Sequence, residues 1–317
     1  MARHLIGRRG FLTMTGGGLL LPGLAGAGAM EALSGEAFGT GWSVTAPHLP
    51  RGVGDAVARL FADFDGELSP WSPESALSRF NRDEVGIAPG SELDVVARAA
   101  LALAEESGGA FDPTVGPLVA RWGFGPIEGG APDWRAVTAG AEIGKARGDL
   151  TLDLCGIAKG RALDLALALL RADGVDAGLF DLGGEVAAIG AHPSGRPWRV
   201  AVEDPLGGAA VLALELADGQ ALATSGLAAQ SYALGGRTWG HIIDPRAGQP
   251  VEGRLRSVTV LSDSAMRADG WATALFAAGD VEGPRLARVG GIAALFLFEE
   301  GGRLQQVATG GIEASVT

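Results

Sequence analysis

Residues 150–161 read Leu150-Thr151-Leu152-Asp153-Leu154-Cys155-Gly156-Ile157-Ala158-Lys159-Gly160-Arg161 and pass from a strand pattern into a helical one. Apolar and polar side chains alternate over Leu150–Leu154, which predicts a strand, and the apolar spacing that follows predicts a helix over 157–172. Small residues at the junction leave room for a ligand near the backbone, and a helix N-terminus beside Lys159 is a candidate anion site. The commoner fate of such a segment is a tight connection with a surface lysine. Lysine occurs at only one other position, Lys145, and this rarity favours a functional role for Lys159.

The regular patterns continue on both sides of this segment. In the N-terminal half, apolar residues recur at helical spacing from Val53 to Phe64, and again from Leu93 to Leu103 behind a Ser91 cap. This order of elements predicts an α+β (mixed α/β) fold with antiparallel or mixed sheets flanked by helices. C-terminal to residue 172 we expect a helix near 264–278 and strands near 178–190, 197–203, 209–216, 256–262, 292–298 and 303–308.

Two connecting segments bear on the organisation of the chain. Leu68–Ser75 contains two prolines, so it cannot be helical throughout and reads as an ordered loop that carries Trp71. Residues 123–132 are rich in Gly and Pro and form a candidate hinge. We expect a single domain over residues 30–317, divided at most by this hinge.

The first 29 residues have the pattern of an export signal. Arg8 and Arg9 precede a Gly-rich, weakly apolar run that ends in the small residues 25–29. This pattern predicts a twin-arginine signal and a soluble periplasmic product. Pro22 and the many glycines argue against a stable membrane-spanning helix, so no stable membrane anchor is expected.

The charge and cysteine content of the chain exclude two further classes. The chain has 25 basic and 37 acidic residues, a net charge of −12, and loss of residues 1–29 removes three arginines and no acid, which leaves −15. Such an acidic protein is a poor nucleic-acid binder. Cys155 is the only cysteine, so there is no disulfide framework. We interpret Cys155 as a small packing residue, with a nucleophilic role as the alternative.

A second group of polar residues lies in Trp239–Val251 and Asp269–Thr273. His241 belongs to a short apolar run that an Asp-Pro turn ends, so its ring is expected at a rim and not in the core. Asp269 and Thr273 are four residues apart and share one helical face. A pair of oxygen ligands suits a hard cation such as Mg2+, which completes its shell with water and phosphate. The pattern indicates phosphate chemistry.

The segment Ala110–Leu118 follows the second predicted helix and turns sharply. Phe111 is either a core residue after a helix cap or a ring that stacks on a ligand. Asp112 either belongs to a structural turn or accepts a hydrogen bond from a ligand. The sequence of this segment alone does not favour either alternative for Phe111 or Asp112.

Taken together, these motifs resemble the ApbE-type FAD:protein FMN transferases and occur in the same order as in that family. The similarity runs from about Phe38 to Leu275. It rests on eight segments in register, which are Phe38–Thr40, Leu68–Asn81, Ala110–Leu118, Asp153–Asp164, Gly183–Glu185, Thr224–Gly226, His241–Gly248 and Ala268–Leu275.

The resemblance implies a T-fold-like core with a site for FAD and Mg2+. By position, it implies Mg2+ ligands at the backbone carbonyl of Gly156, the carboxylate of Asp269 and the hydroxyl of Thr273. It favours the ligand-binding alternative at Phe111 and Asp112. The full set of implied FAD contacts is Phe38, Trp71, Ala110, Phe111, Asp112, Asp153, Lys159 and Ile243.

Four positions depart from the family pattern. Phe38 stands for the usual Met and Trp71 for the usual Tyr, exchanges that keep an apolar or stacking surface. Ala272 stands where some members have a further metal-binding Asp, so we expect one Mg2+ at most. Gly156 is often Ala in relatives, an exchange expected to be harmless if only its carbonyl binds the metal.

The resemblance implies Mg2+-dependent transfer of FMN from FAD to a Thr or Ser hydroxyl of a target flavoprotein, with release of AMP. His241 is the candidate general base because an unperturbed imidazole titrates near neutral pH, and Asp269 could share that role. Lys159 would stabilise negative charge near the phosphates or the flavin. Two alternatives use the same residues: an Mg2+-dependent FAD pyrophosphatase, in which water replaces the protein hydroxyl, and a non-catalytic periplasmic flavin-binding protein.

Overall fold

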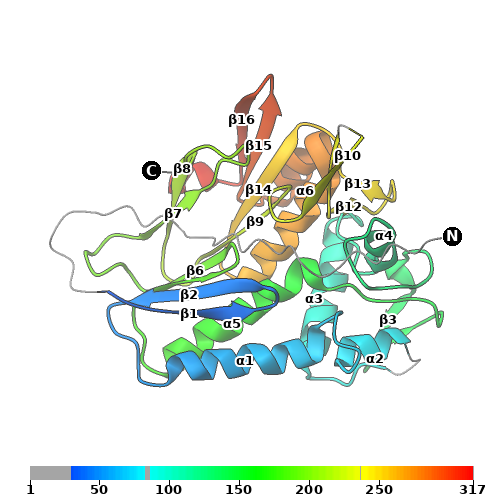
Figure 1. The fold of residues 1–317 in the computed structure, drawn as a ribbon, viewed down its shortest axis with the longest axis horizontal. Coiled ribbons are helices and arrows are strands. Elements are labelled where there is room, and N and C mark those ends of the chain that lie inside the picture. The colour runs from blue at the N-terminus through cyan, green and yellow to red at the C-terminus, as the bar shows by residue number, and fades with distance from the viewer. Residues whose placement is uncertain (1–29, 83–85, 236, 317) are drawn as a thin grey trace, which may run out of the picture.

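An eight-stranded sheet forms the centre of the computed structural model, which describes residues 30–82, 86–235 and 237–316 (Figure 1). The strands follow the order β1-β2-β5-β6-β9-β14-β15-β16, and each neighbouring pair is antiparallel. The expected α+β class with antiparallel sheets is therefore confirmed. The predicted export signal, residues 1–29, lies outside the described residues. The strands of the sheet span Glu31–Ala37 (β1), Thr40–Ala46 (β2), Gly178–Leu182 (β5), Glu185–Ile189 (β6), Ala221–Gly226 (β9), Leu255–Ser262 (β14), Ala294–Glu300 (β15) and Arg303–Thr309 (β16).

Four small antiparallel pairs accompany the large sheet. They are β3 (Val137–Ala139) with β4 (Ile143–Lys145), β7 (Trp198–Val202) with β8 (Leu212–Leu216), β10 (Ser231–Leu234) with β11 (Arg237–Gly240), and β12 (Ile243–Asp244) with β13 (Gln249–Pro250).

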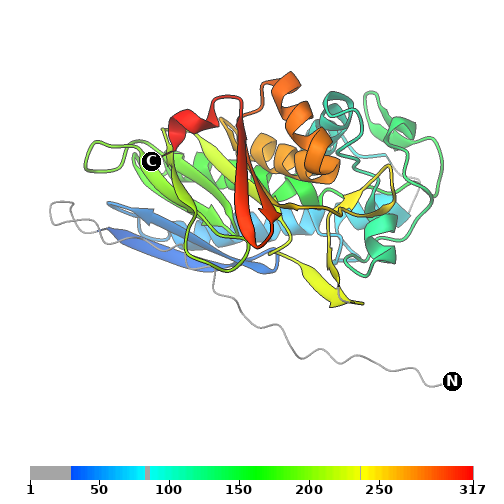
Figure 2. The ribbon, with the colours of Figure 1, turned by 90° about the horizontal axis from the view of Figure 1, so that it is seen from above.

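Helices cover one face of the sheet, and the β7–β8 pair covers the other (Figures 1 and 2). Side chains along a strand point alternately to the two faces. In β15, Phe296 belongs to the large core under the helices, whereas its neighbours Leu295 and Leu297 belong to a smaller core with Trp198 of β7. The described helices are α1 (Val53–Leu68), α2 (Ala76–Arg82), α3 (Glu92–Glu106), α4 (Gly116–Arg121), α5 (Cys155–Ala172), α6 (Ala265–Gly290) and the 3₁₀ turns η1 (Trp134–Ala136) and η2 (Ile312–Ser315).

Helices α5 and α6 meet at a very close backbone contact. A Cβ atom built at Gly160 would lie 2.2 Å from the carbonyl oxygen of Ala265, so only glycine fits at this crossing. Asp164, one turn further along α5, caps the start of α6. Its carboxylate accepts hydrogen bonds from Ser264 Oγ (2.8 Å), Ala265 N (2.7 Å) and Met266 N (3.1 Å). These contacts fix the register between the two helices.

The β1–β2 hairpin turns at Phe38 and Gly39, whose φ angles are 52° and 74°. Two successive residues with positive φ are typical of the tight hairpin turn whose twist matches that of the strands. Phe38 tolerates this conformation because its ring packs edge-on against Phe61 (5.3 Å) and Phe64 (5.8 Å) of α1. Packing against α1 therefore holds the turn in place.

The periodic segments of the sequence are found as predicted. The helices expected from Val53 and from Leu93 are α1 and α3, and Ser91 Oγ accepts from the backbone N–H of Asp94 (3.1 Å) as the expected cap. The helix expected over 157–172 is α5, which begins two residues earlier at Cys155. The strands expected after residue 178 are also present, although 178–190 forms two strands separated by a turn at Gly183–Gly184.

The strand predicted over Leu150–Leu154 is wrong. Leu150, Leu152 and Leu154 are buried, as their alternation predicts, but the segment joins no sheet. Its backbone groups are paired in other ways. The side-chain amide of Asn81 donates to Leu152 O (2.8 Å) and its Oδ1 accepts from Leu152 N (2.7 Å), and Asp153 N donates to Pro113 O (2.7 Å). The Asn81 side-chain amide thus makes the two hydrogen bonds to Leu152 that a neighbouring strand would otherwise make.

Two other expectations need correction. The helical region expected to end near 278 continues to Gly290, past a break at Gly279 where φ is 79°. Cys155, interpreted as a packing residue, is exposed. It begins α5, where the chain leaves the core, and the apolar residues that pack are its neighbours Leu154 and Ile157.

In the described parts of the chain, none of the helices combines the length and hydropathy needed to cross a bilayer. Residues 123–132, the candidate hinge, connect α4 to η1, and a hinge motion there stays a prediction.

We predict that Gly160→Ala lowers the free energy of unfolding by about 3 kcal/mol, at the upper end for overpacking a well-packed interior. The added methyl group would meet rigid backbone of α6 and not a movable side chain. Gly66→Ala is the matched control, because Gly66 lies within α1 and a Cβ there meets no atom within 4 Å. That change should raise the free energy of unfolding by roughly 0.5–1 kcal/mol. Urea denaturation measures both, and equal effects of the two changes would contradict the close contact at Gly160.

Candidate active site

The three residues implied as metal ligands lie together where α5 begins against α6. Gly156 faces the side chain of Thr273, since a Cβ built at Gly156 would lie 2.9 Å from Thr273 Cγ2 and 3.0 Å from Thr273 Oγ1. One turn further along α5, the backbone N–H of Gly160 donates to Asp269 Oδ2 (3.0 Å). Asp269 and Thr273 therefore face the first turns of α5 from one side of α6, as their spacing predicts.

These groups fit a hard cation. A backbone carbonyl, a carboxylate and a hydroxyl are all oxygen donors, the kind that Mg2+ prefers. The bond from Gly160 occupies Oδ2 of Asp269 and leaves Oδ1 for another partner, and Ser225 Oγ lies 3.2 Å from Thr273 Oγ1. Within the described residues, no cluster of three or more His, Cys, Asp or Glu is arranged for a metal. A cation at this place would thus have one carboxylate ligand, Asp269.

A Cβ atom at position 156 would meet the side chain of Thr273 in this chain. Only the carbonyl of Gly156 was expected to matter, but the α-carbon of Gly156 lies against Thr273. An alanine methyl group would require the Thr273 side chain to shift, because the contact would be closer than real Cβ atoms show. The position of the Thr273 side chain therefore depends on the absence of a side chain at Gly156.

Lys159 is paired with an acid that the sequence analysis did not single out. Its Nζ lies 2.6 Å from Oε2 of Glu185, which is only 3% exposed at the start of β6. Burial lowers the pKa of Lys159, but the charges of Glu185 and Asp269 outweigh this, so the pKa is raised and the lysine keeps its proton.

Burial shifts the two acids around Lys159 in the same direction. It raises the pKa of Glu185 to about 7 although Lys159 acts against the shift, and the charge of Asp269 adds to it. Burial also raises the pKa of Asp269, again against the effect of Lys159. One cation and two acids therefore share a largely buried space.

His241 is oriented by a backbone carbonyl. Its Nδ1 lies 3.1 Å from the carbonyl oxygen of Gln230, which also accepts from the backbone N–H of His241 (3.2 Å). Because a carbonyl only accepts, Nδ1 carries the proton in this contact, and Nε2 is the unprotonated nitrogen of the neutral ring. Burial lowers the pKa of His241, and Lys159 adds to the shift, against the opposing effects of Gln230 and Asp153. The neutral ring is a base at neutral pH.

The β10–β11 hairpin rises between Gln230 and His241 and is held by aromatic stacking. Trp239 stacks on Trp122 (5.1 Å between ring centroids), and Tyr232 stacks on Phe124 (5.1 Å). Phe124 also meets the His241 ring edge-on at 6.3 Å. The segment after α4 therefore supports both the hairpin and the imidazole at its base.

Asp112 and Asp153 lie in neighbouring turns. Asp112 Oδ1 accepts from the backbone N–H (2.8 Å) and the hydroxyl (2.6 Å) of Thr114. Asp153 Oδ1 accepts from Cys155 N (3.1 Å), and its own N–H donates to Pro113. Burial raises the pKa of both carboxyl groups against these hydrogen bonds. Because Asp153 is bonded to Cys155, the first residue of α5, these turns border the start of that helix.

Cys155 lies at the same helix start and is a weak nucleophile. The surrounding protein desolvates the thiol although part of the residue is exposed, and Asp153 and Asp269 add negative charge, so its pKa is raised well above the ordinary value. A thiol in that state carries little thiolate, and thiolate is the reactive form. The site does not favour the nucleophilic alternative.

Three of the implied FAD contacts have buried side chains. Ala110 and Phe111 are each 4% exposed and Ile243 is 3% exposed, and Phe111 belongs to the large core. Such side chains offer almost no surface for a flavin to stack on, so a ligand contact at these positions would come from the backbone. The geometry gives Phe111 the core role that its sequence context left open.

Two implied FAD contacts lie on turns. Trp71 is 68% exposed on the two-proline loop between α1 and α2, as predicted for an ordered loop. Phe38 is half-buried in the β1–β2 turn, which touches the turn before Glu185, because a Cβ at Gly183 would lie 2.5 Å from the side chain of Thr40. The turn that carries Phe38 therefore borders the turn that leads to Glu185.

The structure adds three groups to which the sequence analysis gave no role in the site: Glu185 and Ser225, which lie in two of the family segments, and the carbonyl of Gln230. Glu185 could have been found, because an acid directly after two glycines and at the start of an apolar run is unusual for a surface position. Ser225 and Gln230 act through contacts between distant segments, which a single sequence does not reveal.

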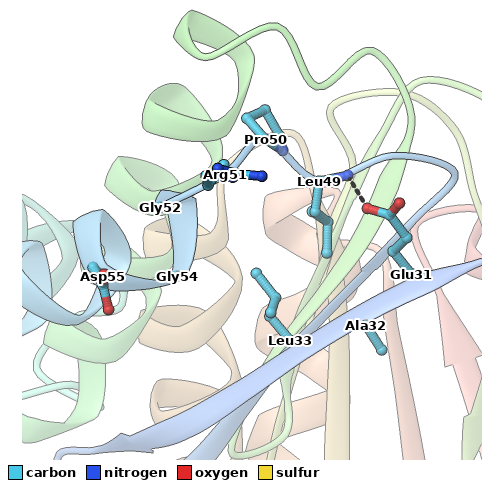
Figure 3. Close-up of a pocket in the computed structure, with 9 residues that line it drawn as sticks. All are labelled: Glu31, Ala32, Leu33, Leu49, Pro50, Arg51, Gly52, Gly54 and Asp55. Atoms are coloured by element: carbon cyan, nitrogen blue, oxygen red, sulfur yellow. Dashed lines mark hydrogen bonds between the residues drawn. The ribbon is translucent and has the colours of Figure 1, made fainter.

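Two hollows in the protein surface lie away from these residues. One, of about 300 Å³, is formed by β1 and the segment before α1, and there Leu49 N donates to Glu31 Oε2 (2.6 Å) (Figure 3). The other, of about 450 Å³, lies between α1, Glu92 at the start of α3, and α5. Neither includes a predicted site residue. The candidate site is thus identified by its polar groups and not by the size of a cavity.

Comparison with known proteins identifies the family of the chain. The ApbE family model matches residues 38–296. A relative from Klebsiella pneumoniae named FAD:protein FMN transferase is 34% identical over 295 residues, which cover 85% of this chain and 84% of the relative. A relative of the same name from Rhodobacter capsulatus is 39% identical over 218 residues, or 64% of this chain and 41% of the relative.

Solved structures agree with the sequence relatives. The flavin transferase ApbE from Vibrio cholerae superimposes with a TM-score of 0.80 at 30% identity, over 90% of this chain and 99% of that one. The apo form of the Pseudomonas stutzeri flavinyl transferase ApbE also gives a TM-score of 0.80, at 32% identity, over 90% of this chain and 96% of that one. The fold, the order of the motifs and these relatives lead to one conclusion: the chain belongs to the ApbE family.

Proposed function

We propose that the protein is an FAD:protein FMN transferase, which moves FMN from FAD to a Thr or Ser hydroxyl of another protein. One observation carries this proposal: the start of α5, with Gly156 and Lys159, lies directly against Asp269 and Thr273 of α6. A helix N-terminus and an ammonium group favour a phosphate, and the oxygen ligands beside them favour a cation bound to that phosphate.

The reaction is a displacement at phosphorus. The acceptor hydroxyl oxygen attacks the phosphorus atom of the FMN half of FAD, the bond from that phosphorus to the bridging oxygen breaks, and AMP leaves with the electron pair. His241 Nε2 takes the hydroxyl proton, since Nδ1 is held by Gln230. Lys159 and the first turn of α5 stabilise negative charge on the phosphates. A magnesium ion held by Gly156, Asp269 and Thr273 would supply Lewis-acid stabilisation of the same charge.

The remaining residues would bind FAD and exclude competing chemistry. Trp71 offers an exposed aromatic face for a flavin or adenine ring, and Phe38 offers an apolar edge. Asp112 and Asp153 have oxygen atoms near the helix start that can accept hydrogen bonds from the ligand. Position 272 is an alanine, which has no carboxylate, so it provides no second acidic ligand and a single metal ion is expected.

The proposed place of action is the periplasm. This rests on the twin-arginine pattern of residues 1–29, with the double arginine at 8 and 9 and the small residues at 25–29. The acceptor would then be a flavoprotein subunit with a Thr or Ser exposed on the same side of the membrane.

The proposal is tested by incubating the purified protein with FAD, Mg2+ and a flavoprotein subunit that accepts FMN through a threonine. We expect the mass of the acceptor to rise by one FMN phosphoester, with AMP formed in equal amount, and both products to be lost with EDTA or in Asp269→Ala. AMP with free FMN and an unmodified acceptor would instead indicate the pyrophosphatase. Tight binding of FAD without either product would indicate a flavin carrier.

The pH dependence of the transfer reports on His241. Burial lowers the pKa of His241 below the ordinary 6.5, so the ring is an unprotonated base throughout the neutral range. Protonation removes the base, so kcat/KM for the acceptor should stay level above pH 7 and fall about tenfold per pH unit only below the lowered pKa. His241→Gln should reduce kcat by roughly 10²- to 10⁴-fold and abolish this acidic limb. An unchanged limb in His241→Gln would assign the base to another group.

The exposed ring of Trp71 gives a test of the FAD site that does not depend on turnover. We predict that Trp71→Ala weakens FAD binding by about fivefold to tenfold, the effect of losing one aromatic stacking contact, whereas Trp71→Tyr keeps most of the affinity. Flavin fluorescence titration measures both. Because Trp71 is 68% exposed, neither change should alter the thermal unfolding temperature. Equal affinity of Trp71→Ala and the unaltered protein would remove Trp71 from the FAD site.

A further inference from the structure

Two buried acids lie in the surroundings of Lys159, and it is bonded to only one of them. Its Nζ is 2.6 Å from Glu185 Oε2, whereas no ion pair joins Lys159 to Asp269 among the described residues. Asp269 is nevertheless nearby, because it accepts the backbone N–H of Gly160, the residue after Lys159, and its charge raises the pKa of Lys159. Asp269 itself accepts only the N–H of Gly160 among the described hydrogen bonds, and it is 4% exposed.

Glu185 is buried at the start of a central strand, whereas Lys159 can reach a different acid by rotation of its own side chain. Glu185 is the first residue of β6, a central strand whose residues are all buried, and it follows a turn whose Gly183 touches Thr40. Lys159 projects from α5 on a flexible four-carbon chain. Because an ammonium group and a divalent cation bind the same carboxylate oxygen, a lysine that reached Asp269 would compete with the cation.

We propose that Glu185 is a positioning residue that holds Lys159 away from Asp269 and so keeps this carboxylate free for a divalent cation. Glu185 does not touch the cation. It offers Lys159 a carboxylate to pair with in place of Asp269. Lys159 then stays charged beside the phosphate site, and Asp269 stays available to the metal. The inference deepens the proposed function, because the cation site is the one used there.

The competing explanation is that Glu185 acts only through its charge. Removing a negative charge near a cation site weakens cation binding by simple electrostatics, whether or not the lysine moves. The two explanations differ in a double-mutant cycle. If the lysine competes for Asp269, the loss of Glu185 matters only while Lys159 is present. If charge alone acts, Lys159 stays where it is when Glu185 is lost. Burial raises the pKa of Glu185 and Lys159 opposes this shift, so Glu185 takes up a proton more readily in the Lys159→Met background. The cycle is therefore decided together with the position of Lys159 Nζ in the Glu185 variant.

The experiment measures binding of Mn2+ alone, without FAD or acceptor, to the full-length protein by electron paramagnetic resonance. The variants are Glu185→Ala, Lys159→Met and the two combined, with Glu185→Gln as a second variant that preserves the shape of the side chain. We expect Glu185→Ala to weaken Mn2+ binding at least tenfold, and the same change to have less than a twofold effect in the Lys159→Met background. Glu185→Gln should give a smaller loss in the same direction, and it replaces Glu185→Ala in the cycle if the latter does not fold.

A crystal structure of the Glu185 variant without metal should place Lys159 Nζ in an ion pair with Asp269. Glu92→Ala is the matched control, because Glu92 also pairs with a basic residue of α5, Arg161 (2.8 Å), but away from the cation site. It should leave Mn2+ affinity unchanged. An equal effect of losing Glu185 in both backgrounds, or Mn2+ affinity unaffected by its loss, would overturn the proposal.

The result does not depend on transfer activity. If the protein binds Mn2+ with the expected cycle but transfers no FMN, the proposed function fails and the role of Glu185 stands. If FMN transfer proceeds and the cycle is additive, the proposed function stands and the proposed role of Glu185 fails.

Discussion

The site depends on the contact between Gly160 of α5 and the backbone of α6 at Ala265. Because no side chain separates the helices there, the N–H of Gly160 reaches Asp269, one turn beyond Ala265. One turn towards the start of α5 and one turn further along α6, Gly156 lies against Thr273. Asp164 fixes this register by capping α6, where its carboxylate satisfies N–H groups that otherwise lack a partner at a helix start. The spacing of the site residues thus follows from one backbone contact and one cap.

The helix crossing buries three ionisable groups, although burial ordinarily favours the uncharged form of such groups. Desolvation disfavours each charged form, and it raises the pKa of Asp269 and Glu185. Lys159 opposes both shifts, which leaves two acids sharing one cation. An arrangement with more acid than base is incomplete without a further positive charge. The divalent cation proposed for this site would supply that charge, and the phosphates of a ligand would balance the cation, so we expect binding of metal and of FAD to favour each other.

Periodicity in the sequence predicted α1, α3, α5 and most strands, because those elements bury one regular face. It failed at Leu150–Leu154, where the leucines are buried as a strand would bury them but the backbone is paired with the Asn81 amide. Hydrophobic spacing reports burial and not the identity of the hydrogen-bonding partner. The same limit applies to the site: Asp269 and Thr273 share a helical face and could be paired in advance, whereas the partners Glu185 and Gln230 depend on how separate segments meet.

The groups proposed to bind phosphate and metal and the group proposed to act as base lie on different kinds of structure. The phosphate and metal groups lie on α5, α6 and the buried strand β6, where packing leaves little room for displacement. His241 instead follows the β10–β11 hairpin, a separate two-stranded pair that stacks on Trp122 and Phe124 outside the large sheet. FAD presents the same phosphates in every turnover and benefits from a rigid site. The acceptor is a protein that must approach from solvent. A base at the foot of this hairpin, as we propose for His241, would give the acceptor hydroxyl access without disturbing the helices that carry the proposed phosphate site.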